Sequence, residues 1–454
     1  MDNLLQRYGS RKIAGEIYWS GKEAVRDGIT PARNTVIYPK MVRIRQTFDR
    51  PKVADIATAV TSALEPLNLS QRIKPGQSVA LTAGSRGIAN IPLVLRSTAA
   101  FLKKLGAKPF LIPAMGSHGG GTAEGQRHII ESYGITEEFV GVPIRASMDT
   151  VQMGVTAEGF PVLLDRIASE ADHIGVVGRV KPHTGYHGPL ESGLMKMMMI
   201  GLGKHAGALA CHRILLDYPY DQVVRSIGRT LLAAAPIAFG LALVENAYDE
   251  TAIIEGVAPD AFEKREEQLL AEARRLLARL PLRKADLLIV DEIGKNISGS
   301  GMDTNVVGRK RAFRTQAALE GIPIMRLIYV RGLTEKTHGN ATGIGLADFT
   351  STRLVQQMDY RATTINCLTA GYPEGAFVPV HFGTDREVID AALAIIGTRA
   401  PEQARILRIH NTMHLDELDV SEPCLMEPER QSEFAAVGRL RPFEFDTTGN
   451  LPSL

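Results

Sequence analysis

Three short loops carry the side chains best suited to chemistry, and each loop follows an apolar segment of strand length. They are residues 83–87 with Arg86, residues 116–121 with His118, and residues 181–189 with His183. Histidine suits proton transfer because it titrates near neutral pH, and the guanidinium fork of arginine suits a carboxylate or a phosphate. Because ligands bind at the carboxyl ends of strands in open α/β sheets, these loops predict one site at one edge of a sheet.

Glycines surround His118 in the run from Gly116 to Thr122. Glycine lets the backbone approach a ligand closely, and the run precedes a predicted helix, capped by Thr122, whose first amide groups suit an anion. It is not a Walker loop, because the Lys-Ser/Thr ending is missing. A single loop of this kind is more often a flexible turn with a surface histidine, but three such loops at one sheet edge favour a site.

Two residues further along the chain are also candidates. Lys196 lies within the methionine-rich segment 194–201, and two interpretations stay open for it. The side chain either reaches water from a core-lining segment or is a desolvated lysine that serves as a nucleophile or covalent anchor. His212 follows sixteen residues later and by itself would be an ordinary helix histidine. His187 has a supporting role at most, because the Gly and Pro residues around it argue against a helical metal pair.

Apolar periodicity predicts strands and helices in alternation, which indicates largely parallel sheets. Strands are predicted over residues 41–48, 78–82, 109–115, 173–180, 237–244 and 251–257, and helices over 53–67, 91–105 and 123–133. A charged helix over 261–281 ends at Pro281, where a second α/β pattern begins. Its strands are predicted over residues 285–290, 324–330 and 363–368, and its helix over 386–396. One further strand-like piece, residues 404–410, lies in the polar tail after residue 400.

The length of 454 residues exceeds what one hydrophobic core usually organises. We therefore predict two α/β domains with largely parallel sheets and an inter-domain active-site cleft. The N-terminal domain is predicted over residues 1–280, with residues 1–50 as a lead-in, and the C-terminal domain over residues 281–405. Residues 406–454 are predicted to form a tail, for which packing back on the N-terminal domain is one arrangement.

Composition excludes several classes of protein. The 52 basic and 50 acidic side chains leave a net charge of +2, and the run Arg309-Lys310-Arg311 is too short to indicate a nucleic-acid partner. Three scattered cysteines argue against a disulfide framework, a zinc finger or an iron–sulfur cluster. The N-terminus is polar and no apolar stretch reaches the length of a membrane span, so we expect a cytoplasmic protein without a membrane partner.

The order of these residues resembles the nickel-pincer-nucleotide-dependent lactate racemases and their homologues. The resemblance covers mainly residues 75–215, with a weaker similarity over residues 285–311. The positions that carry it are Ser85-Arg86, Gly116-Ser-His118, Pro182-His183, Ser192-Gly-Leu-Met-Lys196, Gly201 and His212.

The resemblance implies a cofactor and a role for each residue. The cofactor is a nicotinate-derived mononucleotide with two sulfur-bearing groups, one of them joined to Lys196 as a thioamide. Nickel is then held by two sulfurs, a ring carbon and His212, a ligand set that suits square-planar Ni(II). His118 and His183 are the acid/base pair. Ser85, Arg86 and one of Arg309 and Lys310 are implied to bind the cofactor or the substrate carboxylate.

The implied reaction is the racemisation or epimerisation of a 2-hydroxy acid. Hydrogen leaves carbon 2 as hydride to the cofactor, so one histidine takes the hydroxyl proton and the other serves the opposite enantiomer. The implied partners are a small 2-hydroxy-acid substrate and the enzymes that make the cofactor.

Three departures from the family pattern favour a substrate other than lactate, such as a sugar acid. Ala83 stands where the family has an acidic residue, and no Tyr-Gln pair precedes Lys310. The one tryptophan is Trp19, so the family's late active-site tryptophan is missing. The loop Thr337–Gly343, with His338-Gly339-Asn340, either selects the substrate or is a capped surface turn.

Two other functions stay open. A lyase or hydrolase could hold a simple divalent metal through His118, His183 and His212, if the fold brings them together. Lys196 argues against that function, because a simple metal site does not need it. A non-catalytic cofactor-binding protein is the other alternative, although binding alone would not require both acid/base histidines.

Overall fold

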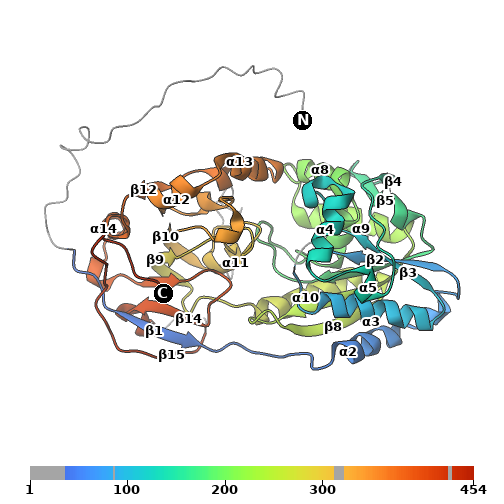
Figure 1. Ribbon diagram of the computed structural model, residues 1–454, viewed down its shortest axis with the longest axis horizontal. Coiled ribbons are helices and arrows are strands. Elements are labelled where there is room, and N and C mark those ends of the chain that lie inside the picture. The colour runs from blue at the N-terminus through green and yellow to red at the C-terminus, as the bar shows by residue number, and fades with distance from the viewer. Residues whose placement is uncertain (1–35, 85–86, 311–321, 428–431) are drawn as a thin grey trace, which may run out of the picture. The chain divides into compact units, whose positions relative to one another are not determined.

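The protein is described from a computed structural model (Figure 1). The described residues are 36–84, 87–310, 322–427 and 432–454. The chain divides into two units, residues 1–37 and residues 38–454, and the sheets and helices described below belong to the second unit. This unit contains a five-stranded sheet, an eight-stranded sheet and a small hairpin of β4 (Thr150–Val155) and β5 (Pro161–Asp165).

The five-stranded sheet has the order β3-β2-β6-β7-β8. Its strands are β2 (Ser78–Ala83), β3 (Lys108–Pro113), β6 (His173–Arg179), β7 (Ile237–Glu245) and β8 (Thr251–Val257). The first four are parallel and β8 is antiparallel to β7. The three candidate loops follow β2, β3 and β6, so the prediction that they share one edge of a parallel sheet is confirmed.

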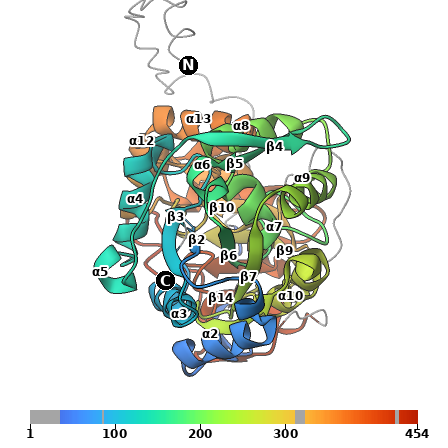
Figure 2. The same cartoon turned by 90° about the vertical axis from the view of Figure 1, so that its right-hand side faces the viewer.

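Helices cover both faces of this sheet, as Figure 2 shows. On one face lie α2 (Ile56–Leu64) and α3 (Ile91–Lys104), and on the other lie α7 (Leu194–Lys196), α9 (Tyr220–Ala234) and α10 (Phe262–Leu276). Each face has its own apolar core. The strands are therefore buried on both faces, which explains their nearly continuous apolar sequences.

The eight-stranded sheet has the order β12-β11-β10-β9-β13-β14-β1-β15. Its parallel strands are β9 (Lys284–Val290), β10 (Ile324–Val330), β11 (Phe349–Ser351), β12 (Val380–Phe382) and β13 (Ile406–Ile409). Its antiparallel strands are β14 (Glu417–Ser421), β1 (Met41–Gln46) and β15 (Phe434–Ala436). The two-domain α/β class with mostly parallel sheets is thus confirmed.

Strands from both ends of the chain complete this second sheet. Val42 of β1 pairs with Val420 of β14, and Leu407 of β13 pairs with Leu288 of β9. The sequence placed β1 in a lead-in and β13, β14 and β15 in a tail, because local periodicity does not reveal pairing between residues so far apart. The domain boundary near residue 281 stays a prediction.

The strand predicted over residues 363–368 is wrong, because this segment lies in the helix α13 (Tyr360–Thr369). Its run of β-branched residues suggested a strand. The carboxylate of Asp359 caps the helix by accepting from Ala362 N, and the Thr363 hydroxyl donates to the Asp359 carbonyl. These local bonds support the helix against the strand propensity of its residues.

The other α-helices of the described residues are shorter than α3, α9 and α10. They are α4 (Ala123–Ser132), α5 (Glu137–Val140), α6 (Arg166–Ser169), α8 (Lys204–Ile214), α11 (Thr304–Val307), α12 (Thr352–Gln357), α14 (Asp385–Ala394) and α15 (Glu422–Leu425). The predicted cap of α4 is confirmed, because Thr122 Oγ1 accepts from Gly125 N at 3.1 Å.

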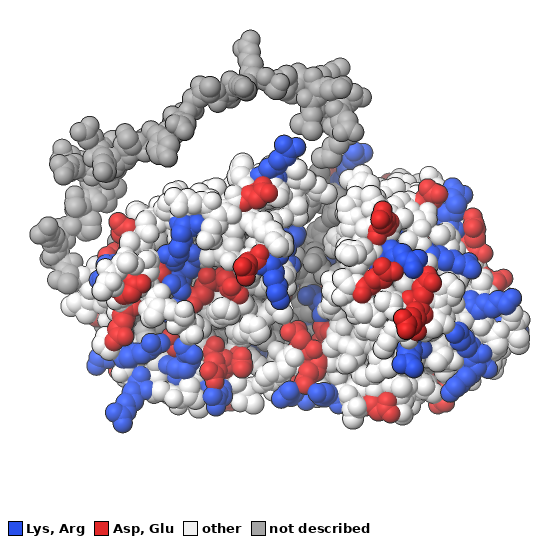
Figure 3. Space-filling model, in the orientation of Figure 1, with Lys and Arg blue, Asp and Glu red and all other residues white. Residues whose placement is uncertain are grey.

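The surface and the cysteines agree with the composition. On the face in Figure 3, basic and acidic side chains are interspersed. Cys211, Cys367 and Cys424 are buried and form no disulfide. Within the described residues, no helix combines the length and the apolar character needed to cross a membrane.

Gly175 in β6 tests the packing of the first sheet. A Cβ atom there would lie 2.5 Å from Phe239 Cζ and 2.7 Å from Leu81 Cδ2. We expect Gly175→Ala to lower the free energy of unfolding by about 1–3 kcal/mol, measured by urea denaturation. Gly438→Ala is the control, because its Cβ would approach only Arg43 Cβ, at 3.8 Å. Equal midpoints for Gly175→Ala and the wild type would contradict this packing.

Candidate functional site

The methionine-rich segment that carries Lys196 packs beneath the ends of three strands. It consists of α7 and a π-helix, Met197–Gly201. A Cβ atom at Gly84, after β2, would lie 3.2 Å from Met197 Cε, and one at Gly116, after β3, would lie 3.0 Å from Ile200 Cγ2. One at Gly178, in β6, would meet Met197 Cβ at 3.7 Å. Small residues at these strand ends therefore bring the segment close to the edge where the candidate loops begin.

Lys196 occupies the junction between α7 and the π-helix. Single-turn π-helices occur often at functional sites, because the extra residue redirects the side chains around it. The Lys196 side chain is half-buried, as is that of His212 in the last turn of α8. Helix α8 also packs on the His118 loop, since a Cβ atom at Gly116 would lie 3.3 Å from Ala208 Cβ.

His183 has a defined ring orientation. Its Nδ1 accepts from Gly185 N at 2.9 Å and from Tyr186 N at 3.1 Å. The ring stacks on Tyr186 with centroids 4.6 Å apart, and Tyr186 stacks on Tyr220 at 4.4 Å. Because Nδ1 is an acceptor, this hydrogen-bond pattern assigns the proton of the neutral ring to Nε2, which then presents an N–H donor.

The buried carboxylate of Glu191 holds the loop that carries His183. It accepts from His183 N at 2.5 Å and from Gly188 N at 3.3 Å, so it ties both ends of the turn. Arg274 of α10 donates to it at 2.7 Å, and His187 Nδ1 lies 3.3 Å away. Burial lowers the pKa of His187, although the Glu191 charge opposes this shift. His187 therefore supports the loop, as the sequence suggested.

Two contacts join the His183 loop to the segment that precedes residue 311. Lys310 Nζ lies 3.6 Å from Glu191, and the Thr304 hydroxyl donates to the Thr184 carbonyl at 2.5 Å. Lys310 is almost fully buried, and burial lowers its pKa. Arg309 instead pairs with Asp348 at 2.6 Å. The geometry thus brings Lys310, and not Arg309, to the first-sheet loops.

The His118 loop is held by Gln126 of α4. The Gln126 amide donates to the carbonyl oxygens of Gly116 at 2.8 Å and His118 at 3.3 Å. A Cβ atom at Gly119, where φ is +66°, would lie 2.6 Å from Gln126 N. Position 119 of this loop therefore needs a glycine, because it lies close to the main chain of α4. The His118 side chain itself is exposed.

Lys204 is a fully buried lysine below this loop. Its Nζ donates to the Pro113 carbonyl at the end of β3 at 2.5 Å, lies 3.4 Å from Gln126 Oε1, and lies 2.8 Å from Asp165. The pair with Asp165 is held by charge more than by an aligned hydrogen bond. A buried ion pair with further hydrogen bonds gives this corner a single arrangement.

Ser85 and Arg86 lie outside the described residues. Among the described residues that follow them, Ala89 N donates to Glu245 Oε1 at 2.6 Å. Glu245 ends β7 and also pairs with Arg179 at the end of β6. Gln126, Glu191 and Glu245, which make these contacts, are side chains that the sequence analysis did not select.

Glu266 of α10 supports the helix that carries Lys196. Its carboxylate accepts from Met195 N at 3.0 Å in the first turn of α7. The N-cap residue of this helix is Gly193, which has no side chain to accept such a bond. A Cβ atom at Gly193 would lie 2.3 Å from this carboxyl group. Burial raises the pKa of Glu266 to about 7, although the bonds from Met195 N and Leu194 N lower it.

Of these supporting residues, the sequence carried a signal for Glu266 alone. It falls on the apolar face of α10 together with Phe262, Leu269, Leu270 and Ala273, and a lone carboxylate on such a face indicates a buried partner. Glu191 lies in a loop and Lys204 at the first residue of α8, a helix that the sequence analysis did not predict. Gln126 lies in the predicted helix 123–133 as an ordinary polar residue, so nothing local marks these three.

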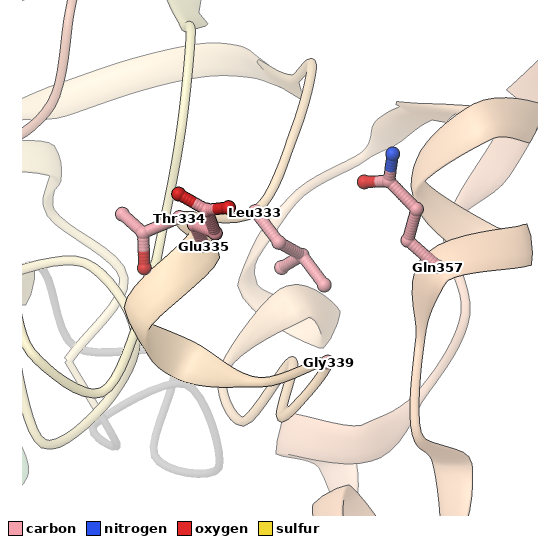
Figure 4. Close-up of a pocket in the computed structure, with 5 residues that line it drawn as sticks. All are labelled: Leu333, Thr334, Glu335, Gly339 and Gln357. Carbon is pink, nitrogen blue, oxygen red and sulfur yellow. The ribbon is translucent and has the colours of Figure 1, made fainter.

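The loop Thr337–Gly343 borders a cavity of about 290 Å³ in the second sheet's domain. Figure 4 shows Thr334 and Glu335 on one side of it and Gln357 on the other, with Gly339 below. The carbonyl oxygen of Gln357 would lie 2.9 Å from a Cβ atom at Gly339, where φ is +77°, so this position favours glycine. No other candidate residue among those described lines this cavity.

Within the described parts of the chain, no cluster of three or more His, Cys, Asp or Glu side chains could hold a metal ion. His118, His183 and His212 all belong to those parts. These three histidines therefore do not form such a cluster in the structure.

The fold and the loops define an α/β protein with its candidate site at the carboxyl edge of a parallel sheet. Residues 35–222 match the family model of the lactate racemase N-terminal domain. The predicted resemblance is thus confirmed over these residues, which are similar to a lactate racemase N-terminal domain.

Among solved structures, the lactate racemase apoprotein from Thermoanaerobacterium thermosaccharolyticum is similar at 13% identity. The match covers 82% of this chain and 98% of that chain, with a TM-score of 0.48. No curated protein matches the chain.

Glu191→Gln tests the support of the His183 loop. The change keeps the shape but removes the charge that Arg274 and the main-chain amides share, so the loop should open more often. We expect amide hydrogen exchange at His183 and Gly188 to rise about tenfold or more, which corresponds to about 1.4 kcal/mol. Glu170→Gln, at an exposed position, is the matched control. Unchanged exchange in the Glu191 variant would show that the carboxylate does not hold the loop.

Glu266→Gln tests the buried carboxyl. The folded state keeps its proton up to about pH 7, whereas the ordinary pKa of a glutamate, which applies to the unfolded chain, is 4.5. Its contribution to the free energy of unfolding therefore falls as pH rises from about 4.5 to 7, by about 3 kcal/mol, and is constant above.

We expect the stability of the wild type, relative to Glu266→Gln, to fall by that order between pH 5 and 8 in urea titrations. Glu272→Gln, on the exposed side of the same helix, should not change the pH profile. Parallel profiles for the wild type and Glu266→Gln would contradict the burial of an ionisable group here.

Proposed function

We propose that the chain is a racemase or epimerase of a 2-hydroxy acid other than lactate, and that it works with a nickel-pincer nucleotide joined to Lys196. The observation that carries the proposal is the position of Lys196, in a segment that packs against the ends of β2, β3 and β6. The family match over residues 35–222 supports the racemase class.

The residue types fit such a cofactor. The amine of Lys196 suits a thioamide link, and the imidazole of His212 is a donor that Ni(II) accepts beside sulfur. Ser85 and Arg86, which lie outside the described residues, and Lys310 are proposed to meet anionic groups of the cofactor or the substrate. Arg309 takes no part, because Asp348 occupies it. When bound, the group supplies a hydride acceptor for carbon 2 of the substrate.

The protein's own groups then move the hydroxyl proton. His118 and His183 are proposed to form the acid/base pair. The neutral imidazole of one accepts the proton of the hydroxyl group, and the imidazolium form of the other gives a proton back to the oxygen. The roles exchange for the other enantiomer. Glu191 and Gln126 keep the two loops in place while the protons move.

The substrate is proposed to be bulkier or more polar than lactate, because this chain lacks the Tyr-Gln pair and the late tryptophan of the family pattern. The lyase or hydrolase alternative is not favoured by any observation, since His118, His183 and His212 do not form a metal-binding cluster among the described residues.

Three variants test these roles in protein co-expressed with the cofactor-biosynthesis enzymes. Lys196→Ala should carry neither nucleotide nor nickel. His118→Ala and His183→Ala should keep both but lose about 10²–10⁴-fold in turnover of 2-hydroxy acids, as expected for a missing acid or base. Lys264→Ala, on an exposed helix face, is the control. A fully active Lys196→Ala variant would exclude the covalent role.

A further inference from the structure

A second cluster of charged side chains lies at the carboxyl edge of the eight-stranded sheet. One residue comes from each of the five parallel strands or from the segment that follows it. Asp291 follows β9, Arg331 follows β10, Arg353 lies in α12 after β11, Asp385 begins α14 after β12, and Arg408 lies in β13.

The position of this cluster is that of a ligand site. The chain runs from β9 outward through β10, β11 and β12, and then returns to place β13 on the other side of β9. Such a reversal of strand order opens the crevice in which α/β sheets bind their ligands. Asp291 and Arg408, on the two strands that flank the reversal, pair there at 2.8 Å.

The two carboxylates do not use all the donors of the three arginines. Arg331 bonds Asp291 and Asp385, and Arg353 bonds Asp385 at 2.5 Å. Three cations facing two anions leave one positive charge in excess, in a place where Arg331 and Arg408 are largely buried.

Each arginine also donates to one short segment, Gly449–Pro452, which we term the strap. Arg331 donates to the Leu451 carbonyl at 2.7 Å and Arg408 to the Pro452 carbonyl at 2.5 Å. Arg353 donates to the Asn450 side-chain oxygen at 2.8 Å. Each arginine therefore gives one N–H to an uncharged oxygen of the strap.

The strap is also held at the first turn of α14. Leu451 N donates to Asp385 Oδ2 at 2.9 Å, and the amide groups of Asp385 and Arg386 donate to Asn450 Oδ1 and the Gly449 carbonyl. The strap thus makes the contacts of a bound peptide, with only acceptors facing the arginines.

We propose that this crevice is an anion-binding site for a phosphate or carboxylate group, and that the strap occupies it in the structure described. Three oxygen atoms of the strap already accept hydrogen bonds from the arginines, at the positions that the oxygen atoms of a bound anion would take. An anion gains a charge-assisted bond from each arginine, whereas the strap offers neutral oxygens, which bind more weakly. This site is separate from the racemase site at the first sheet and does not depend on the proposed function.

Leu451→Arg tests the proposal in the full chain, because Leu451 is buried and a charged side chain is costly to bury, so the change should release the strap. Inorganic phosphate and acetate are titrated separately by calorimetry. We expect one of them to bind at least about tenfold more tightly than to the wild type, since a site open for a tenth of the time binds about tenfold more weakly. Ser453→Arg, exposed, should behave as the wild type. Arg353→Met added to Leu451→Arg should remove the gain.

A folded Leu451→Arg variant that binds neither anion more tightly than the wild type would overturn the proposal. The strap would then be an ordinary part of the packed structure. If this variant does not fold, hydrogen exchange of the Leu451 amide in the wild type decides. Phosphate or acetate should accelerate that exchange relative to sodium chloride of equal ionic strength, because an anion competes with the strap. Equal exchange in all three salts would contradict the site.

Discussion

The close packing of three strand ends on the segment Gly193–Gly201 is the constraint on which the candidate site depends. Gly84, Gly116 and Gly178 leave no side chain between the sheet edge and this segment. The loops that begin at the same edge therefore start close to the helix that carries Lys196. Because the strands are parallel and buried on both faces, neither the sheet nor the segment can shift without disturbing two apolar cores.

Buried charged and polar side chains then fix the loops that apolar packing alone would leave free to move. Glu191 ties the His183 loop, Lys204 and Gln126 brace the His118 loop, and Glu266 caps the short helix before the π-turn. Each is desolvated and each has partners, so its loss would leave an unpaired charge or main-chain amide inside the protein. A fixed tautomer at His183 is one consequence, since both acceptor bonds of Nδ1 come from a turn that Glu191 holds.

The local sequence predicted the regular elements where periodicity was strong. Strands β2, β3, β6 and β7 and helices α3, α4 and α10 lie within a few residues of their predicted ranges. The strand expected over residues 363–368 failed because capping by Asp359 outweighed β-propensity. The joining of β1 with β14 could not be predicted, because it rests on long-range pairing. In the site, residue type marked His118, His183 and Lys196, whereas Glu191 and Lys204 act through contacts that only the folded chain creates.

Covalent anchoring of a nickel-bearing nucleotide by Lys196 is the central claim. The most direct test is peptide mapping by mass spectrometry, with nickel analysis, on wild-type protein co-expressed with the cofactor-biosynthesis enzymes. We predict a mass increase of nucleotide size on the peptide that contains Lys196, with about one nickel per chain as a single site requires. An unmodified Lys196 without nickel, beside a family member loaded in parallel, would contradict it.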